Sequence, residues 1–184
     1  MQILAISGSP RKEGNTEYLV DVFLKTAEKL GANVDHIRLS EFKIHPCDSC
    51  WICVENGICA IKDEMGEIYP KLLASDGILI ASPIYFNNVT AQTKIFIDRT
   101  WCMRRKLKGK VGGCVVVGRR FGHETAIQAI HSFFLKHEIT VSYRGVVGFA
   151  FRKGEITNDV HAIKNAKYLA KSMIVLIKRL QHRK

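Results

Sequence analysis

The sequence predicts an α/β fold, a doubly wound five-stranded parallel sheet with the strand order 2-1-3-4-5. Five short apolar runs, each typical of a buried strand, alternate with segments in which apolar residues recur at helical spacing. Such alternation favours parallel strands, and the right-handed crossover rule together with the strand number favours this order. The chain has 184 residues, enough for one such domain and too few for two comfortable ones, so we expect a single domain over 1–184.

The N-terminal part supplies the first two strands. Residues 2–7, QILAIS, form a short apolar run that ends in a loop rich in glycine and hydroxyl groups. From Glu17 the apolar residues lie on one helical face, and Gly31 is placed to end that helix. Residues 33–39 predict the second strand, and an irregular cysteine-rich loop at about 44–62 follows it.

The middle part supplies the third strand between two helices. Residues 63–76 predict a helix capped by Asp63, although Pro70 removes a hydrogen bond and should kink or break it. Residues 77–82, GILIAS, are wholly apolar, which suits the centre of a parallel sheet. A helix over about 90–101 follows.

The C-terminal part completes the alternation. Residues 110–118 predict the fourth strand, and a helix to about Lys136 follows the loop RRFGHE. Residues 139–148 predict the fifth strand. A final helix over about 156–181 has one apolar side for the core and lysines on the other side.

Composition limits the class of protein. Hydrophobic residues make up 47% and charged residues 24%, as in ordinary globular proteins. No apolar run approaches the roughly 18–20 residues that span a membrane, and the N-terminus lacks the basic start of a signal peptide, so we expect a cytoplasmic protein with no membrane partner. The net charge of +11 suits an anionic cofactor, an acidic protein partner or nucleic acid, although a solvated lysine-rich surface is the simpler interpretation.

The loop after the first strand, SGSPRKEGNT, offers groups that bind an anion. Ser7, Ser9 and Thr16 supply hydroxyls. Asn15 supplies an amide and Arg11 adds charge, while the N-terminus of the following helix adds backbone N–H groups and a dipole. The alternative is an ordinary turn that holds no ligand.

The same loop departs from the common nucleotide-binding motifs. Five residues separate Gly8 from Gly14 where a Walker A loop has four, and Asn15 stands where its lysine should be. The spacing of a GxGxxG loop is also absent. A single monophosphate therefore fits better than a triphosphate or a dinucleotide pyrophosphate.

The loop after the third strand, SPIYFNN, offers a surface for a flat ring. Pro83 stiffens its start, and Tyr85 and Phe86 supply aromatic faces at the ligand end of the sheet. Asn87 and Asn88 tolerate left-handed backbone, which a tight loop presenting N–H groups to a ring edge needs. The alternative is that both aromatic residues belong to the core.

The loop after the fourth strand, GRRFGHET, contains two glycines, two arginines and His123. An isolated histidine is more often a satisfied polar residue than a catalyst. Proton handling by His123 is therefore the less favoured interpretation, although histidine as a residue type often serves in proton transfer.

Three ordered motifs carry a resemblance to a known family. The stretches GSPRKEGNT, SPIYFNNVTAQTKIFIDR and GRRFGHETAIQAIHSFFLKHEI resemble the NADPH-dependent FMN reductase-type flavoproteins of the flavodoxin-like superfamily, and the resemblance covers nearly the whole chain. It implies a flavodoxin-like, FMN-dependent oxidoreductase with the FMN phosphate in the first loop and the flavin ring between the other two. The sequence departs from the family pattern at Asn87, Asn88 and His123.

From the loops and the resemblance we expect a set of FMN-binding residues and no catalytic side chain, because the cofactors supply the chemistry. The expected residues are Ser7, Ser9, Arg11, Asn15, Thr16, Pro83, Ile84, Tyr85, Phe86, Asn87, Asn88, Gly118, Arg119 and Gly122.

Four cysteines fall within thirteen residues, in the stretch CDSCWICVENGIC. A disulfide staple is uncommon in a reducing compartment, so metal binding or redox chemistry is favoured. Consecutive gaps of two residues let one loop wrap three corners of a cubane, whereas structural zinc sites usually pair two CxxC hairpins across a longer spacer. An apolar cluster without metal stays open as an alternative.

The cysteine spacing resembles the compact motif of archaeal and anaerobe iron–sulfur flavoproteins. That resemblance implies a 4Fe–4S cluster beside the FMN, held by Cys47, Cys50, Cys53 and Cys59. Cys102 and Cys114 follow a different pattern and are expected to be core cysteines, which behave as small hydrophobic residues.

We therefore expect an electron-transfer flavoprotein that accepts electrons from a ferredoxin-like carrier and passes them through FMN to dioxygen, peroxide or a quinone-like compound. The resemblance also implies a homodimer or homotetramer with a cluster near the flavin of a neighbouring subunit. One alternative is an NAD(P)H-dependent FMN, quinone or nitro reductase without a cluster. Another is a zinc-stapled module that binds nucleic acid, which the flavin-binding loops argue against, so we expect no nucleic-acid partner.

Overall fold

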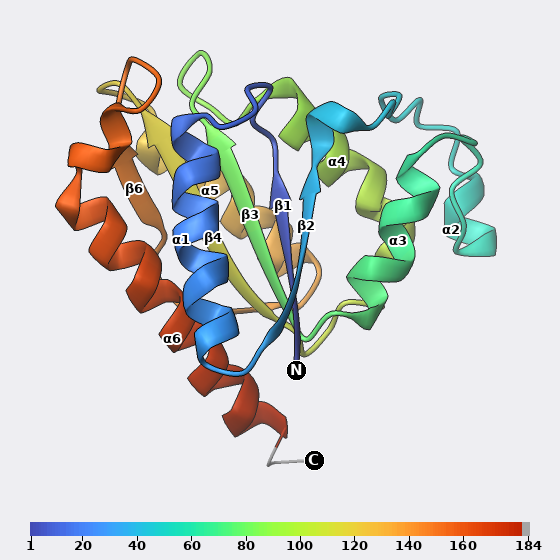
Figure 1. The fold of residues 1–184 in the computed structure, drawn as a ribbon. Helices are drawn as coiled ribbons and strands as arrows, with labels where there is room; N and C mark the ends of the chain where they lie inside the picture. Colours follow the sequence, from blue (N-terminus) through green and yellow to red (C-terminus); the bar gives the residue numbers. More distant parts are fainter. Residues whose placement is uncertain (182–184) are drawn as a thin grey trace.

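The computed structural model describes residues 1–181 and contains the predicted parallel sheet (Figure 1). The strands lie in the order β2-β1-β3-β4-β5, and a further strand, β6, also pairs with β4. All of these pairs are parallel, so the predicted class and order are confirmed. The strands are β1 Gln2–Ser7, β2 Asn33–Arg38, β3 Gly77–Pro83, β4 Val111–Gly118, β5 Thr140–Val141 and β6 Val146–Phe149.

Helices cover both faces of the sheet (Figure 1). α1 and α6 lie side by side on one face and bury their apolar sides there, while α3, α4 and α5 pack on the other face. The helices are α1 Asn15–Lys29, α2 Ile52–Asn56, α3 Met65–Ala74, α4 Ala91–Arg99, α5 His123–Lys136 and α6 Val160–Gln181. Within residues 1–181, every helix is too short or too polar to cross a membrane.

The central strands are apolar throughout because both of their faces are covered. In β1, Ile3 and Ala5 belong to the core under α1 and α6, whereas Leu4 and Ile6 belong to the core under the other helices. This alternation is the period-two geometry of a strand, and it explains why parallel sheets produce continuous apolar runs.

The fifth predicted strand is wrong in one respect, because the structure divides 139–148 into β5 and β6. Residues 142–145 separate the two strands, and Gly145 among them has a φ of +114°. A Cβ at this position would lie 2.9 Å from Cys114 Sγ. The chain passes so close to β4 that only glycine fits, and strand pairing is interrupted at these residues.

Of the kink or break predicted at Pro70, the break is wrong. α3 continues through Pro70, and its first residue, Met65, donates its backbone N–H to Asp63 Oδ1 at 3.1 Å. Proline removes one N–H donor, but Ile68 and Leu72 on either side of it are fully buried. Packing against the sheet therefore holds the helix together across the proline.

Two other helix boundaries differ from the prediction. α6 begins at Val160 rather than at about 156, because Asp159 Oδ1 accepts the N–H of Ala162 at 2.9 Å and caps the helix there. The short helix η3, Glu155–Asn158, precedes it. α4 ends at Arg99 and is continued by the short helix η2, Thr100–Met103.

His137, directly after α5, makes the stability of the fold depend on pH. The residue is 3% exposed, and its Nε2 lies 3.0 Å from Thr100 Oγ1. Burial lowers the pKa of His137 to about 4; a hydrogen bond to the Met103 backbone opposes this effect and Lys136 adds to it. Between about pH 6.5 and 4 the unfolded chain therefore binds more protons at this residue than the folded chain does, so acidification destabilises the fold.

We expect this histidine to remove roughly 2–3 kcal/mol of stability between pH 7.5 and 4.5. The variant His137→Gln, which cannot titrate, should lose less stability over the same interval. Urea unfolding of both proteins at the two pH values measures the difference. Equal losses in the two proteins would contradict the assignment.

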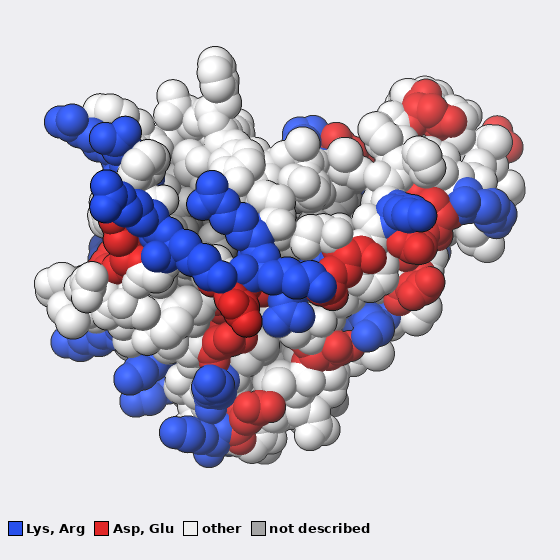
Figure 2. All heavy atoms as spheres, turned by 45° about the horizontal axis from the view of Figure 1, so that its top comes forward, with Lys and Arg blue, Asp and Glu red and all other residues white. Residues whose placement is uncertain are grey.

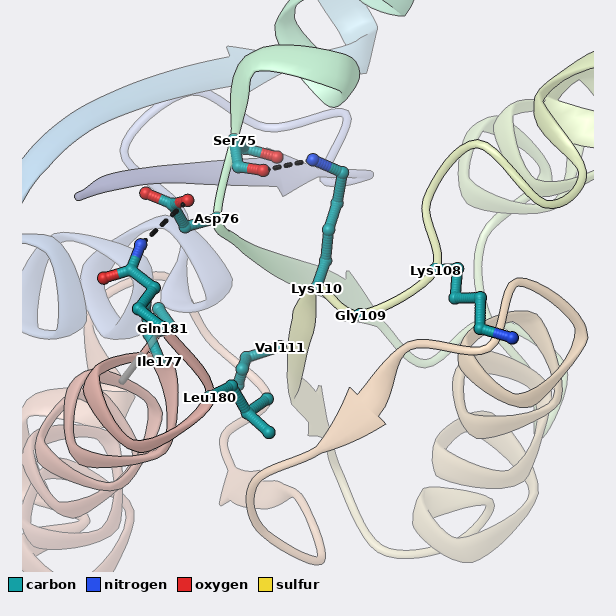
Figure 3. A pocket seen from close by; sticks show the side chains of 9 residues that line it. All are labelled: Ser75, Asp76, Lys108, Gly109, Lys110, Val111, Ile177, Leu180 and Gln181. Atoms are coloured by element: carbon teal, nitrogen blue, oxygen red, sulfur yellow. Dashed lines mark hydrogen bonds between the residues drawn. The ribbon is translucent and has the colours of Figure 1, made fainter. Parts of the chain in front are cut away.

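The edge of the sheet where the strands begin carries a cavity of about 160 Å³ (Figure 3). Asp76 accepts hydrogen bonds from the N–H of Gln2 at 2.8 Å and from Gln181 Nε2 at 3.2 Å. Lys110 reaches the backbone carbonyl of Ser75. These hydrogen bonds connect the starts of the strands with one another and with the end of α6. The polar groups around this cavity therefore serve the fold, and we assign it no ligand.

Candidate functional site

A cavity of about 250 Å³ lies at the carboxyl edge of the sheet, between the loops that follow β1, β3, β4 and β6. Doubly wound sheets bind ligands at this edge, beside the switch point between the first and third strands. The predicted residues that line it are Ser9, Arg11, Asn15, Thr16, Pro83, Ile84, Tyr85, Gly118 and Arg119. The predicted residues that do not line it are Ser7, Phe86, Asn87, Asn88 and Gly122.

The N-terminus of α1 forms one end of this cavity. Gly14 precedes the helix, and among the described residues no side chain caps it, so its N–H groups keep the partial positive charge of a helix N-terminus. Ser9 Oγ lies 3.2 Å from both the N–H and the carbonyl oxygen of Arg11, which shapes the loop in front of the helix. This end of the cavity suits a phosphate group.

Two of the predicted phosphate residues have protein partners. Ser7 is fully buried inside β1 and donates its hydroxyl to the carboxylate of Glu17. Asn15 lines the cavity, but its Nδ2 donates to the Arg152 carbonyl at 2.8 Å and its Oδ1 accepts the N–H of Gly154 at 2.9 Å. Ser7 therefore supports the loop from within the sheet, and Asn15 holds the loop after β6 in place as a wall of the cavity.

The loop after β3 forms a tight turn. Tyr85 and Asn88 exchange two backbone hydrogen bonds, of 2.9 and 3.1 Å, around Phe86 and Asn87. The left-handed residues are Phe86, with a φ of +50°, and Asn87, with a φ of +61°, rather than the predicted pair Asn87 and Asn88. Phe86 is fully exposed at the tip, so it belongs neither to the core nor to the cavity.

The loop after β4 closes the cavity on the other side. Arg119 lies with its guanidinium carbon 4.5 Å from the ring centroid of Phe151, and both residues line the cavity. Gly122 has a φ of +86°, and a Cβ there would lie 2.5 Å from Asn87 Cα. Its role in the structure is to let the two loops touch, which only glycine allows at this backbone conformation.

Sequence reasoning missed four residues of the cavity: Gly14, Val117, Ala150 and Phe151. Ala150 and Phe151 belong to the loop after β6, which is not among the three binding loops that the sequence predicts. The place of this loop in the sequence could have identified it, because the loop follows the carboxyl end of a strand in a parallel sheet, where ligands bind.

His123 starts α5 and is buried away from the cavity. Its Nε2 lies 3.2 Å from the carbonyl oxygen of Gly148, and its ring centroid lies 4.6 Å from that of Phe149. The histidine joins α5 to β6, and the geometry gives no support to a role in proton transfer.

The four cysteines of the predicted metal site line one small cavity, of about 80 Å³. They belong to the segment between β2 and α3, which projects beside α3 and α4 (Figure 1). Cys47 and Cys50 are exposed, Cys53 and Cys59 are half-buried, and all four are free thiols. The other residues around the cavity are Asp48, Ser49, Trp51, Ala60, Ile61 and Trp101.

The backbone of this cysteine loop bends sharply at three left-handed residues. These are Ser49 with a φ of +59°, Trp51 with +64° and Gly57 with +66°. Alternation of left- and right-handed backbone gathers N–H groups on the concave side of a loop, where they stabilise anions such as cluster sulfurs. The Cys50 N–H is held by Asp48 Oδ1 at 3.2 Å, which fixes one of these bends.

The thiols lie near one another. Burial raises the pKa of Cys53, and the neighbouring thiols of Cys102, Cys59, Cys47 and Cys50 raise it further. Four thiolates in such a group repel one another unless a cation lies between them. The loop therefore suits a positively charged inorganic centre.

A single metal ion and a cluster place different demands on the four thiols. Within residues 1–181, no three His, Cys, Asp or Glu side chains are close enough together to hold one metal ion. A zinc ion needs its thiolates at about 2.3 Å from a common point. A cubane spreads four thiolates around a larger body, and the consecutive two-residue gaps of this loop suit that arrangement.

The remaining two cysteines are buried, as predicted. Burial raises the pKa of Cys114 to about 12. Cys102, in η2, lies behind the cysteine loop: burial raises its pKa, a hydrogen bond with Tyr69 opposes this, and Cys59 adds to it. Cys102 is therefore a core residue that touches the rear of the candidate metal site.

Basic side chains gather at the carboxyl edge of the sheet. Figure 2 shows Lys and Arg in a band across this face, with Asp and Glu interspersed among them. Some of these charges are paired, as in Lys12 with Glu41 at 2.9 Å and Lys153 with Glu13 at 3.3 Å. The excess of positive charge favours anionic ligands and partners at this face.

A family described as NADPH-dependent FMN reductase matches residues 1–153. The chain belongs to this family. The match includes every residue that lines the cavity at the carboxyl edge of the sheet. As a member of the FMN reductase family the chain is an FMN-dependent oxidoreductase, as predicted.

Individual proteins similar to this family member agree with that assignment. An iron-sulfur flavoprotein of Methanocaldococcus jannaschii is 39% identical over 189 residues, which cover 97% of this chain and 98% of that protein. An iron-sulfur flavoprotein of Methanosarcina thermophila is 41% identical over 146 residues, 77% of this chain and 76% of that protein. The expected resemblance to iron–sulfur flavoproteins is confirmed.

A solved structure shows the same fold. RosB with a bound 8-demethyl-8-formylriboflavin-5′-phosphate intermediate has a TM-score of 0.81 and 18% sequence identity to this chain. The match covers 99% of this chain and 81% of RosB. At this level of sequence identity, the similarity shows only that the two chains share a fold.

Proposed function

We propose that this FMN reductase-family chain is an electron-transfer flavoprotein that holds FMN at the carboxyl edge of its sheet and a 4Fe–4S cluster in its cysteine loop. The observation that carries the proposal is that Cys47, Cys50, Cys53 and Cys59 line one cavity as free thiols. When bound, the cluster accepts electrons singly and the flavin collects them in pairs.

For FMN, the proposed phosphate site is the uncapped N-terminus of α1 with Ser9, Arg11 and Thr16. The proposed ring site lies between the wall formed by Pro83, Ile84 and Tyr85 and the wall formed by Gly118, Arg119 and Phe151. The other predicted residues, Ser7, Phe86, Asn87, Asn88 and Gly122, shape the loops. No side chain is assigned a proton-transfer or nucleophilic role.

For the cluster, three observations agree. The spacing of the cysteines lets one loop supply all four thiolates. The loop bends sharply around a small cavity that all four thiols line. The two archaeal relatives are named as iron-sulfur flavoproteins.

The positive charge of the chain supports an acidic, ferredoxin-like protein as electron donor, because complementary charge speeds association. We further propose that the final acceptor is dioxygen, peroxide or a quinone-like compound. Neither proposal needs nucleic acid or a membrane, and free thiols fit the reducing cytoplasm.

We also propose a homodimer or homotetramer. The cysteine loop and the FMN cavity lie near opposite ends of α4, so a cluster that serves the flavin of a neighbouring subunit suits this geometry. Large exposed apolar side chains around the two sites offer contact area for such an interface. They are Trp51, Ile58, Phe86, Phe121, Phe149 and Phe151.

Purification without oxygen tests this function. We expect stoichiometric FMN, equal amounts of iron and sulfide, and flavin absorption that bleaches faster with a reduced ferredoxin than with NADPH. FMN without iron or sulfide, reduced rapidly by NADPH, would instead select the reductase activity that the family description suggests. Protein that binds no FMN would overturn both assignments.

A further inference from the structure

A buried ion pair closes the base of the cysteine loop. Arg99, the last residue of α4, has a side chain with 0% exposure, and that of Asp63 is 5% exposed. Arg99 Nη1 lies 2.6 Å from Asp63 Oδ2, and Nη2 lies 3.0 Å from Oδ1. This two-point contact between a guanidinium and a carboxylate is the strong, geometrically specific form of the pair.

The same pair binds the backbone on both sides of the loop. Arg99 Nη1 donates to the His45 carbonyl at 2.7 Å, and Nη2 donates to the Ile61 carbonyl at 3.4 Å. Asp63 Oδ2 accepts the N–H of His45 at 2.8 Å. His45 precedes the first cysteine and Ile61 follows the last, so Arg99 fixes both ends of the segment that carries the thiols.

One N–H donor of Arg99, at Nε, is buried and has no acceptor among the described residues. A buried N–H without an acceptor is costly and rare, so it needs an explanation. Cys59 lies two positions before Ile61, whose carbonyl Arg99 contacts, and both residues line the cavity of the cysteine loop, which places this thiol near the guanidinium.

We propose that Arg99 is a positioning residue for the cluster: it closes the cysteine loop through Asp63 and His45, and it donates its free Nε–H to the Cys59 thiolate. This inference rests on the proposed function, because the donation is made to Cys59 as a ligand of the proposed cluster. Reduction adds negative charge to a cluster, and hydrogen bonds to its sulfurs favour the reduced form. An N–H donor directed at a ligand sulfur therefore raises the reduction potential of the cluster, and this effect is lost when the donor is lost even if the charge is kept.

The test compares two substitutions that keep the charge. Arg99→Lys retains one positive charge but cannot form the two-point contact and has no Nε–H. Arg104→Lys is the matched control, because Arg104 also reaches the cysteine loop, at the Val54 carbonyl 3.3 Å away, but from the exposed side. Both proteins and the wild type are purified without oxygen, and the midpoint potential of the cluster is measured by redox titration.

We expect Arg99→Lys to shift the equilibrium away from the reduced cluster at least tenfold, which is about 59 mV for a one-electron couple. Arg104→Lys should stay within roughly threefold of the wild type. A potential in Arg99→Lys that matches the wild type would overturn the proposal. If Arg99→Lys fails to fold, the neutral pair Arg99→Gln with Asp63→Asn replaces it, with the same expectation and the same contradicting result.

A second measurement uses protein from which iron has been removed. We expect amide hydrogen exchange in the peptide that contains His45 to be at least tenfold faster in Arg99→Lys than in the wild type or in Arg104→Lys, because the His45 N–H loses its fixed acceptor. Unchanged exchange would overturn the loop-closing role. A wild-type protein that never contains iron or sulfide would instead refute the proposed function, so the two failures are distinguishable.

Discussion

Replacing Cys53 by serine is expected to give a protein that keeps its FMN and contains almost no iron or sulfide. Cys53 lies in α2, is half-buried, and is the thiol whose pKa reflects all four neighbouring cysteines. A serine hydroxyl stays protonated at neutral pH and is a hard oxygen donor, whereas iron–sulfur clusters require soft thiolates. FMN should remain because none of its proposed contacts comes from the cysteine loop.

Metal, sulfide and flavin analyses after anaerobic purification measure this result. Cys102→Ser is the matched control: Cys102 is also close to Cys59, but it is buried behind the loop, with its Sγ 3.6 Å from the Arg99 carbonyl. We expect this variant to keep both cofactors. Retention of the cluster in Cys53→Ser, or its loss in Cys102→Ser alone, would show that the ligand set is assigned incorrectly.

Replacing Gly8 by alanine should abolish tight FMN binding. A Cβ at Gly8 would lie 1.8 Å from Thr93 Oγ1 and 2.9 Å from Thr90 Oγ1. Both threonines are fully buried, and Thr90 Oγ1 donates to the Gly8 carbonyl at 2.8 Å, so neither can move aside cheaply. The loop after β1 must shift instead, and this loop leads to the proposed phosphate site.

Overpacking of this kind destabilises a protein by about 1–3 kcal/mol, and we expect FMN affinity to fall roughly a hundredfold or more. Flavin fluorescence titration and thermal unfolding measure the two effects. Gly66→Ala is the control, because a Cβ at Gly66 in α3 meets nothing within 4 Å and alanine favours a helix. Equal FMN affinity in the two variants would show that the loop after β1 does not form the phosphate site.

The parallel sheet was predictable because its strands are unambiguous. Residues 2–7 and 77–82 are apolar throughout, and their boundaries agree with β1 and with all but the last residue of β3. The division of the last strand was not predictable, because it depends on how closely Gly145 passes Cys114, which is distant in sequence. The continuity of α3 through Pro70 likewise depends on packing, which overrides the local preference.

The candidate site was predictable in its location but not in its hydrogen bonds. Loops at the carboxyl ends of parallel strands can be read from the sequence, and Ser9, Pro83 and Gly118 from three such loops line the cavity; that they bind FMN stays a prediction. The partners of Asn15 lie in a loop far along the chain, and Arg99 is separated from Asp63 by 36 positions. Such pairings follow from tertiary contacts that no local pattern records.

α4 connects the two candidate sites. At its start Thr90 holds Gly8 through a hydrogen bond of 2.8 Å, and at its end Arg99 holds the base of the cysteine loop. A helix rises 1.5 Å and turns about 100° per residue, so nine residues separate the sites by about 13 Å along the axis. The length of α4 therefore fixes both the distance between the two sites and their relative orientation about the helix axis. One residue added within the helix would rotate the Arg99 guanidinium away from the thiols by about 100°.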